Sequence, residues 1–130
     1  MCQKAFAAPF AAFASVAVGN LVWTRGARNT FQSSNAIARG FCGDCGTPLT
    51  FEAASGAGKN IALAICAFDD PAALPPQQQL DLATRIGWLD GVNDLPTRTP
   101  EEDAAQEAKY GPRTSYQHPD HDTETWPPAR

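Results

Sequence analysis

The sequence predicts a mainly β protein of short antiparallel strands, followed by a polar C-terminal extension. Apolar and β-branched segments recur at intervals of roughly ten residues, separated by Gly, Asn and Ser, which is typical of a meandering sheet. The chain has 130 residues, 43% of them hydrophobic, enough for one globular domain with a modest core. From residue 96 on, charged residues, Pro and Gln replace the aliphatic ones. We therefore predict a β domain over residues 1–96 and an acidic extension over residues 97–130.

The expected strands are short segments rich in β-branched or aromatic residues that end at turn residues. The glycines of EAASGAGKN permit positive φ, so a hairpin is expected here, with residues 48–53 pairing antiparallel with residues 60–68. The predicted strands are residues 13–18, 20–24, 29–34, 36–41, 48–53, 60–68 and 82–89.

A turn or a short helix is expected in FDDPAALPP, between the last two of these strands. Asp70 can cap it, Pro71 suits the first helical position, and the following Pro-Pro pair stops it. In the extension, Thr99 is placed to cap a helix over residues 100–110. The rest of the extension is expected to wrap the body or to stay mobile.

The charge is unevenly placed. The last thirty residues hold seven acidic and three basic side chains, and so carry the whole formal net charge of −4. The preceding part of the chain balances its charges and has no basic stripe that could face phosphates. We therefore expect no nucleic-acid partner.

The cysteine usage favours a reducing cytoplasm. Four cysteines, two of them in one C-x-x-C, do not form the dense framework of a small secreted protein. The opening run MCQKAFAAPFAAFASVAV offers the alternative of a signal peptide cleaved near Ala17, but a single lysine precedes the apolar residues and Pro9 interrupts them. The run is also too short to span a bilayer as a helix, so no membrane association is expected.

The stretch RGFCGDCGTPLTF carries the clearest chemical signal. Cys42 and Cys45 are spaced so that both thiolates could reach one zinc at about 2.3 Å, and Gly43 and Gly46 relieve the tight turn between them. A tetrahedral zinc needs four ligands, so the pair would be half of a site. Two alternatives stay open. One is a redox dithiol, although that motif belongs at a helix N-terminus and a strand follows here; the other is a pair of ordinary thiols in a loop.

The remaining cysteines and the two histidines give weaker signals. Cys66 lies in an apolar strand segment and is predicted to be a packed side chain. Cys2 sits in a polar CQK, beside Lys4, where nothing structural calls for a thiol, and is a candidate reactive thiol or metal ligand. His118 and His121 lie among aspartates, but an intervening proline breaks the helical geometry that would join them, so we interpret them as part of a solvated tail.

The segments MCQKAFAAPF, WTRG, FQSSNAIARGFCGDCGTPL and IALAICAFDDP resemble, in this order, the glutathione-dependent formaldehyde-activating enzyme family, which includes the centromere protein V relatives. The resemblance covers residues 1–96, and the element S-S-x-x-x-x-R-x-F-C-x-x-C-G-T is its most specific part. It implies a zinc-bearing all-β tent. Ser33, Ser34 and Arg39 belong to this element, and we interpret them as structural, in hydrogen bonds at strand ends.

The resemblance further implies two zinc sites. Cys42 and Cys45 would share a structural zinc with an N-terminal C-x-C, and Cys2 would be the last cysteine of a C-x-C-x-x-C cluster around a catalytic zinc. The partner cysteines would precede Met1. We expect either that the natural chain starts further upstream or that this is a short form with a reduced site, and the consistent sequence after Cys2 favours the first. Ala7 and Cys66 stand where the family commonly has glycine.

The chemistry implied by the resemblance is that of a carbon–sulfur lyase. A thiol, glutathione in the named members, adds to an aldehyde such as formaldehyde, or the adduct is cleaved again. Cys2 is the expected catalytic residue, zinc the expected cofactor, and a small thiol with an aldehyde the expected partner. A non-catalytic, zinc-stabilised interaction module is the alternative from a different functional class, and a thiol redox protein is a third.

Overall fold

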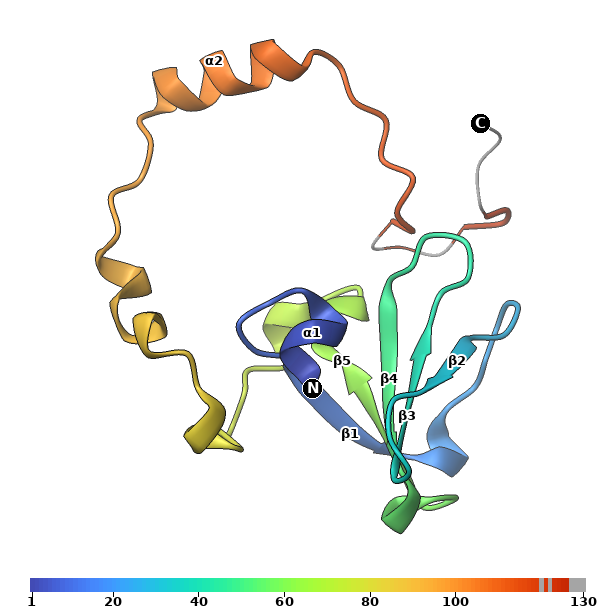
Figure 1. The fold of residues 1–130 in the computed structure, drawn as a ribbon. Coiled ribbons are helices and arrows are strands. Elements are labelled where there is room, and N and C mark those ends of the chain that lie inside the picture. Colours follow the sequence, from blue (N-terminus) through green and yellow to red (C-terminus); the bar gives the residue numbers. More distant parts are fainter. Residues whose placement is uncertain (120, 122, 127–130) are drawn as a thin grey trace.

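A five-stranded antiparallel sheet forms the body of the protein (Figure 1). The computed structural model describes residues 1–119, 121 and 123–126. The strand order is β1-β5-β4-β3-β2, so β2 to β5 form a meander and β1 pairs with β5 at the opposite edge. The prediction of a mainly antiparallel β fold is confirmed. The strands are β1 (Phe13–Ala17), β2 (Asn29–Gln32), β3 (Ile37–Phe41), β4 (Pro48–Ala53) and β5 (Asn60–Ala64).

Two predicted strands are absent from the described residues. Within residues 20–24, Asn20 ends a 3₁₀ turn, Val18–Asn20, and residues 21–24 have no regular secondary structure, since the β1–β5 ladder ends at Ala17. Residues 82–89 form 3₁₀ turns, Leu82–Thr84 and Gly87–Asp94. Away from the sheet, local hydrogen bonds of the turn satisfy backbone groups that an unpaired strand would leave open.

The predicted strand over residues 60–68 is shorter than expected. It ends at Ala64, and Ile65–Ala67 form a 3₁₀ turn. This turn breaks the alternation of side chains, so Cys66 is exposed and its prediction as a packed side chain is wrong. The next turn is confirmed, because the Asp70 carboxylate accepts a hydrogen bond from the Ala73 N–H at 3.3 Å.

An aromatic cluster holds the short helix α1 (Cys2–Phe6) to one face of the sheet. The Phe6 ring meets the Phe13 ring edge-on with centroids 5.4 Å apart, and Phe13 lies 5.6 Å from Phe51. The Arg39 guanidinium lies over the Phe51 ring at 5.2 Å. Phe31, Arg39 and Phe51 are register partners on β2, β3 and β4, so they stand in one row on this face. Helix α1 therefore covers the part of the sheet that contains Arg39.

A polar network lies on the opposite face of β3 and β4, because side chains alternate along a strand. Thr50, only 1% exposed, accepts a hydrogen bond from the Gly40 N–H at 3.0 Å and donates to the Glu52 carboxylate at 2.7 Å. Arg28 donates twice to that carboxylate, at 2.8 and 2.7 Å, and its guanidinium lies 5.2 Å from the Trp23 ring centre. Both oxygens of the Glu52 carboxylate and the Thr50 hydroxyl have partners, so the network ties β3 and β4 together.

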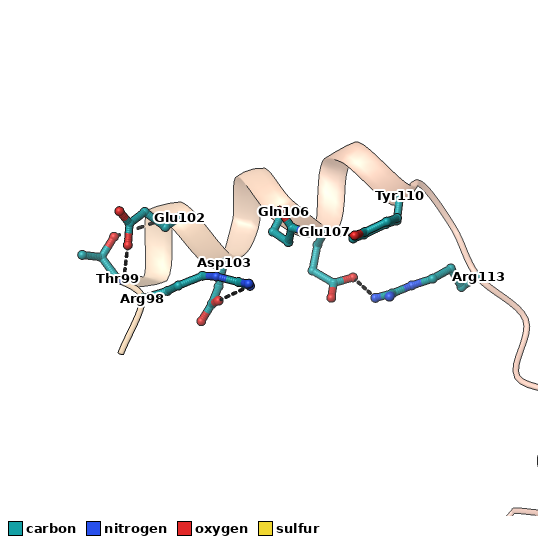
Figure 2. A network of polar contacts seen from close by, with 8 residues as sticks. All are labelled: Arg98, Thr99, Glu102, Asp103, Gln106, Glu107, Tyr110 and Arg113. Carbon is teal, nitrogen blue, oxygen red and sulfur yellow. Dashed lines mark hydrogen bonds and ion pairs between the residues drawn. The ribbon is translucent and has the colours of Figure 1, made fainter. Parts of the chain in front are cut away.

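The C-terminal extension contains helix α2 (Pro100–Tyr110), which starts as predicted at Thr99. Thr99 and Glu102 form a reciprocal capping box, with the Thr99 N–H donating to Glu102 at 2.8 Å (Figure 2). Local pairs such as Arg98–Asp103, 3.6 Å apart, support the helix, which has no buried residue. The extension leaves the sheet in a wide arc and returns to the β3–β4 hairpin (Figure 1). Its division from the body at residue 96 remains a prediction.

None of the helices in the described part of the chain combines the length and apolar character needed to cross a bilayer.

Replacing Gly40 by Ala is expected to destabilise the protein by about 1–3 kcal/mol, the usual cost of overpacking. A Cβ at this position would lie 2.3 Å from Thr50 Oγ1 and 2.5 Å from Arg28 Cδ. Gly19→Ala is the matched control, because nothing lies within 4 Å of its Cβ position. Urea unfolding of the two variants measures the difference, and equal stability would contradict the packing at Gly40.

Replacing Glu52 by Gln is expected to cost about 2 kcal/mol at pH 7 and less in acid. The hydrogen bond from Arg28 holds the pKa of Glu52 below its usual value of 4.5, against the raising effect of burial. The carboxylate therefore adds stability above pH 4.5, and this contribution is lost as the pH falls through the lowered pKa. Unfolding measured from pH 7 to pH 3 should show the wild-type and variant curves converging; a gap independent of pH would contradict this.

Candidate functional site

The two thiols of the C-x-x-C sit in the tight turn that joins β3 to β4. The Cys42 N–H donates to the Thr47 carbonyl and the Gly46 N–H donates to the Cys42 carbonyl, both at 2.9 Å. Gly46 adopts φ +77°, a conformation that favours glycine. The register shifts between Gly40 and Phe41, so the strand enters the turn through an irregularity of the ladder. Local backbone hydrogen bonds and the conformation of Gly46 thus form the tight turn that the sequence predicted.

Cys45 is half-buried and hydrogen-bonded. Its Sγ lies 3.1 Å from the Thr47 hydroxyl oxygen, and that oxygen lies 2.8 Å from the Gln117 side-chain oxygen. Burial raises the pKa of the Cys45 thiol, but hydrogen bonds from the Thr47 side chain and backbone, from Cys42 and from the His118 backbone outweigh this effect. The pKa of Cys45 is therefore lowered, which favours the thiolate that binds metals.

The donor set of the turn matches half of a zinc site. Cys42 and Cys45 are both free and interact with each other through their side chains. Among the described residues, however, no group of three or more His, Cys, Asp and Glu side chains could hold a metal ion. The turn thus holds two soft donor atoms, and a closed tetrahedral site would need two more.

The tail reaches the C-x-x-C turn through side-chain hydrogen bonds. Gln117 contacts Thr47, and Arg25 donates to Thr123 of the same tail segment. The His118 ring bonds to the Pro119 carbonyl at 2.7 Å, and it packs against Trp126. The two aspartates predicted beside the histidines, Asp120 and Asp122, lie outside the described residues.

Cys2 lies on α1, where Arg39 Nη2 donates a hydrogen bond to its Sγ at 3.3 Å. Cys2, Cys42 and Cys45 are not gathered into one three-ligand group in the part of the chain described. Cys2 thus belongs to a second region, centred on Arg39 and separate from the C-x-x-C turn. The roles predicted for the three cysteines remain predictions.

Arg39, which the sequence analysis interpreted as structural together with Ser33 and Ser34, differs from both in its surroundings. Its neighbours in the motif do have the expected structural role, since the Ser33 hydroxyl donates to the Ile37 carbonyl and the Ser34 hydroxyl accepts from the Ala36 N–H. Arg39 is only 7% exposed, and its single hydrogen bond among the described residues goes to Cys2. A basic residue in the middle of an apolar strand was the signal that could have pointed to it.

A family model described as glutathione-dependent formaldehyde-activating enzyme matches residues 1–83. The matched part contains α1, the whole sheet and the C-x-x-C turn, and leaves α2 outside. No curated protein and no solved structure matches the chain significantly.

Replacing Thr47 by Val should slow alkylation of Cys45 near neutral pH. The variant loses the side-chain hydrogen bond that lowers the pKa of Cys45, so less thiolate is present, and the rates should converge in alkali. Iodoacetamide labelling of the metal-free protein, read by mass spectrometry of the Cys45 peptide, measures this. Thr97→Val, in the extension, is the control; an unchanged pH profile in Thr47→Val would contradict the assignment.

Proposed function

Because the chain belongs to the glutathione-dependent formaldehyde-activating enzyme family, we propose that it acts as a zinc-dependent carbon–sulfur lyase on adducts of glutathione with formaldehyde. The observation that carries this proposal is the family match over residues 1–83, which includes Cys2, Cys42 and Cys45. On this proposal the five-stranded sheet is the family's zinc-bearing β-tent.

The reaction joins a thiol to an aldehyde carbon without oxidation or reduction. A sulfur–carbon bond forms as the carbonyl π pair moves to oxygen, the thiol loses its proton, and the oxygen gains one. Cleavage of the hemithioacetal runs through the same steps in reverse. The protein must therefore favour the thiolate, orient the aldehyde, and supply or accept one proton. None of these steps requires a protein disulfide, which is in keeping with the four free cysteines.

Zinc in such a site would lower the pKa of the substrate thiol and hold the thiolate. We assign Cys42 and Cys45 as two ligands of a structural zinc, supported by their shared turn and by the lowered pKa of Cys45. We assign Cys2 to the catalytic zinc. The Arg39 guanidinium beside Cys2 would orient its thiolate, as outer hydrogen bonds do around metal ligands. The further ligands that two zinc sites would need are not gathered around these cysteines among the described residues.

A reducing compartment such as the cytoplasm fits this chemistry. Glutathione is the thiol partner in the proposal, and it remains a nucleophile only while reduced. The four cysteines of the chain are free as well. We therefore propose a cytoplasmic location, with a small thiol and an aldehyde as partners.

The zinc-loaded protein is expected to accelerate exchange between glutathione, formaldehyde and their hemithioacetal. Exchange can be followed by NMR with ¹³C-formaldehyde. Cys2→Ser should lower the rate at least ~10-fold, the scale on which metal sites respond to altered ligand surroundings. Cys66→Ser is the matched control, since Cys66 is exposed and outside both thiol regions, and its rate should equal that of the wild type.

An unaccelerated rate in wild-type protein with zinc fully bound would contradict the lyase proposal. A folded Cys2→Ser variant with unchanged exchange would remove Cys2 from the mechanism. The interaction-module alternative makes a different prediction, in which Cys42→Ser unfolds the domain while Cys2→Ser leaves every property intact. Metal content and thermal unfolding of both variants, measured beside the rates, separate these outcomes.

A further inference from the structure

A cavity of about 470 Å³ lies between α1 and the strands β2, β3 and β4. Its volume is in the range of small-molecule sites. Three aromatic side chains, Phe6, Phe31 and Phe41, form part of its apolar lining. Residues that contribute to the lining are Lys4, Phe6, Phe31, Ser33, Arg39 and Phe41.

Arg39 is a buried cation at this cavity that forms no ion pair with a carboxylate of the described residues. Its Nη2 donates to Cys2 Sγ, whereas Nε and Nη1 have no hydrogen-bond partner among the described residues. The four ion pairs found between described side chains do not include Arg39. A buried charge that is unpaired is costly, and each buried donor left open adds to that cost. The position therefore favours an anion that would accept the free N–H groups.

The charges around the cavity are all of one sign. Lys4 and Arg39 are its charged lining residues, and no carboxylate lines it among the residues described. A second cavity, of about 520 Å³ on the opposite face of the sheet, differs in this respect. There the lining cation Arg28 is already paired with the Glu52 carboxylate at 2.7 Å. Of these two cavities, only the one with Arg39 has lining cations that are not paired with a described carboxylate.

We propose that this cavity binds a carboxylate of the thiol substrate, held by Arg39 and Lys4. The inference rests on the proposed function, because it takes the substrate to be a thiol. It restricts the substrate class to thiols that carry a carboxylate, such as glutathione, and it disfavours neutral thiols. Since Arg39 also bonds Cys2, a carboxylate at Arg39 brings the substrate next to the thiol assigned to catalysis.

Contact of a carboxylate with all the free N–H groups of Arg39 requires a movement of the side chains that enclose them. Arg39 Nε and Nη1 are enclosed in this structure. Met1 lines the cavity and is 69% exposed, whereas α1 is held to the sheet by the contacts of Phe6 and Cys2. Lys4 is exposed and lines the same cavity, so its ammonium group can contact an entering carboxylate.

Calorimetric titration with S-methylglutathione and with its diester tests this proposal. The thioether has no thiol to bind a metal, so the pair of ligands reports on the carboxylates. The full chain should bind the diacid at least ~10-fold more tightly than the diester, the size expected for a charge-assisted pair. Arg39→Gln should remove this preference. Lys4→Gln should weaken diacid binding by about threefold, and the matched control Lys59→Gln, exposed on the β4–β5 hairpin, should not.

Equal binding of diacid and diester, or equal losses in Lys4→Gln and Lys59→Gln, would overturn the proposal. Should Arg39→Gln fail to fold, which circular dichroism would reveal, the diester comparison and the two lysine variants still decide. Hemithioacetal exchange distinguishes this inference from the proposed function. Catalysis without preference for the diacid overturns the carboxylate site alone, whereas a carboxylate preference without catalysis supports the site and contradicts the lyase.

Discussion

The pairing of β3 with β4 is the constraint on which the rest of the structure depends. This register sets Arg39 opposite Phe51 and Gly40 opposite Thr50, and the connection between the two strands forms the C-x-x-C turn. Side chains alternate across a strand, so a slip of one residue would exchange the two faces of the hairpin. The guanidinium would then leave α1, and the Thr50–Glu52 network would lose Gly40. One ladder thus fixes both thiol regions.

The arginines on the two faces of this hairpin differ in whether a carboxylate pairs with them. Arg28 is paired with Glu52 on one face, in a network whose members satisfy one another and which therefore serves stability. Arg39 is more deeply buried on the other face, yet two of its nitrogens lack partners among the described residues. Buried polar groups without hydrogen-bond partners lower the stability of a fold, and proteins retain them mainly at functional sites. The contrast supports a ligand role for the face that α1 covers.

Local signals in the sequence predicted most of the sheet and the turn that carries the thiols. The β4–β5 hairpin, the Asp70 turn and the Thr99 cap follow from residues next to one another in the chain. The failures depend on distant contacts. Residues 82–89 have strand-like composition but no partner strand, and Cys66 is exposed because β5 ends two residues before it. A basic residue in an apolar strand pointed to Arg39, but only the strand register and the position of α1 reveal that its nitrogens are buried and that two of them lack partners among the described residues.

Family membership and the free thiols support one account, in which a zinc-dependent thiol site is built around this hairpin. Native mass spectrometry of the protein isolated from its own cells, with glutathione present and metals retained, tests that account most directly. The account predicts a zinc-bound species and a second species that is heavier by one glutathione. A folded protein that carries no metal and binds no glutathione would contradict it.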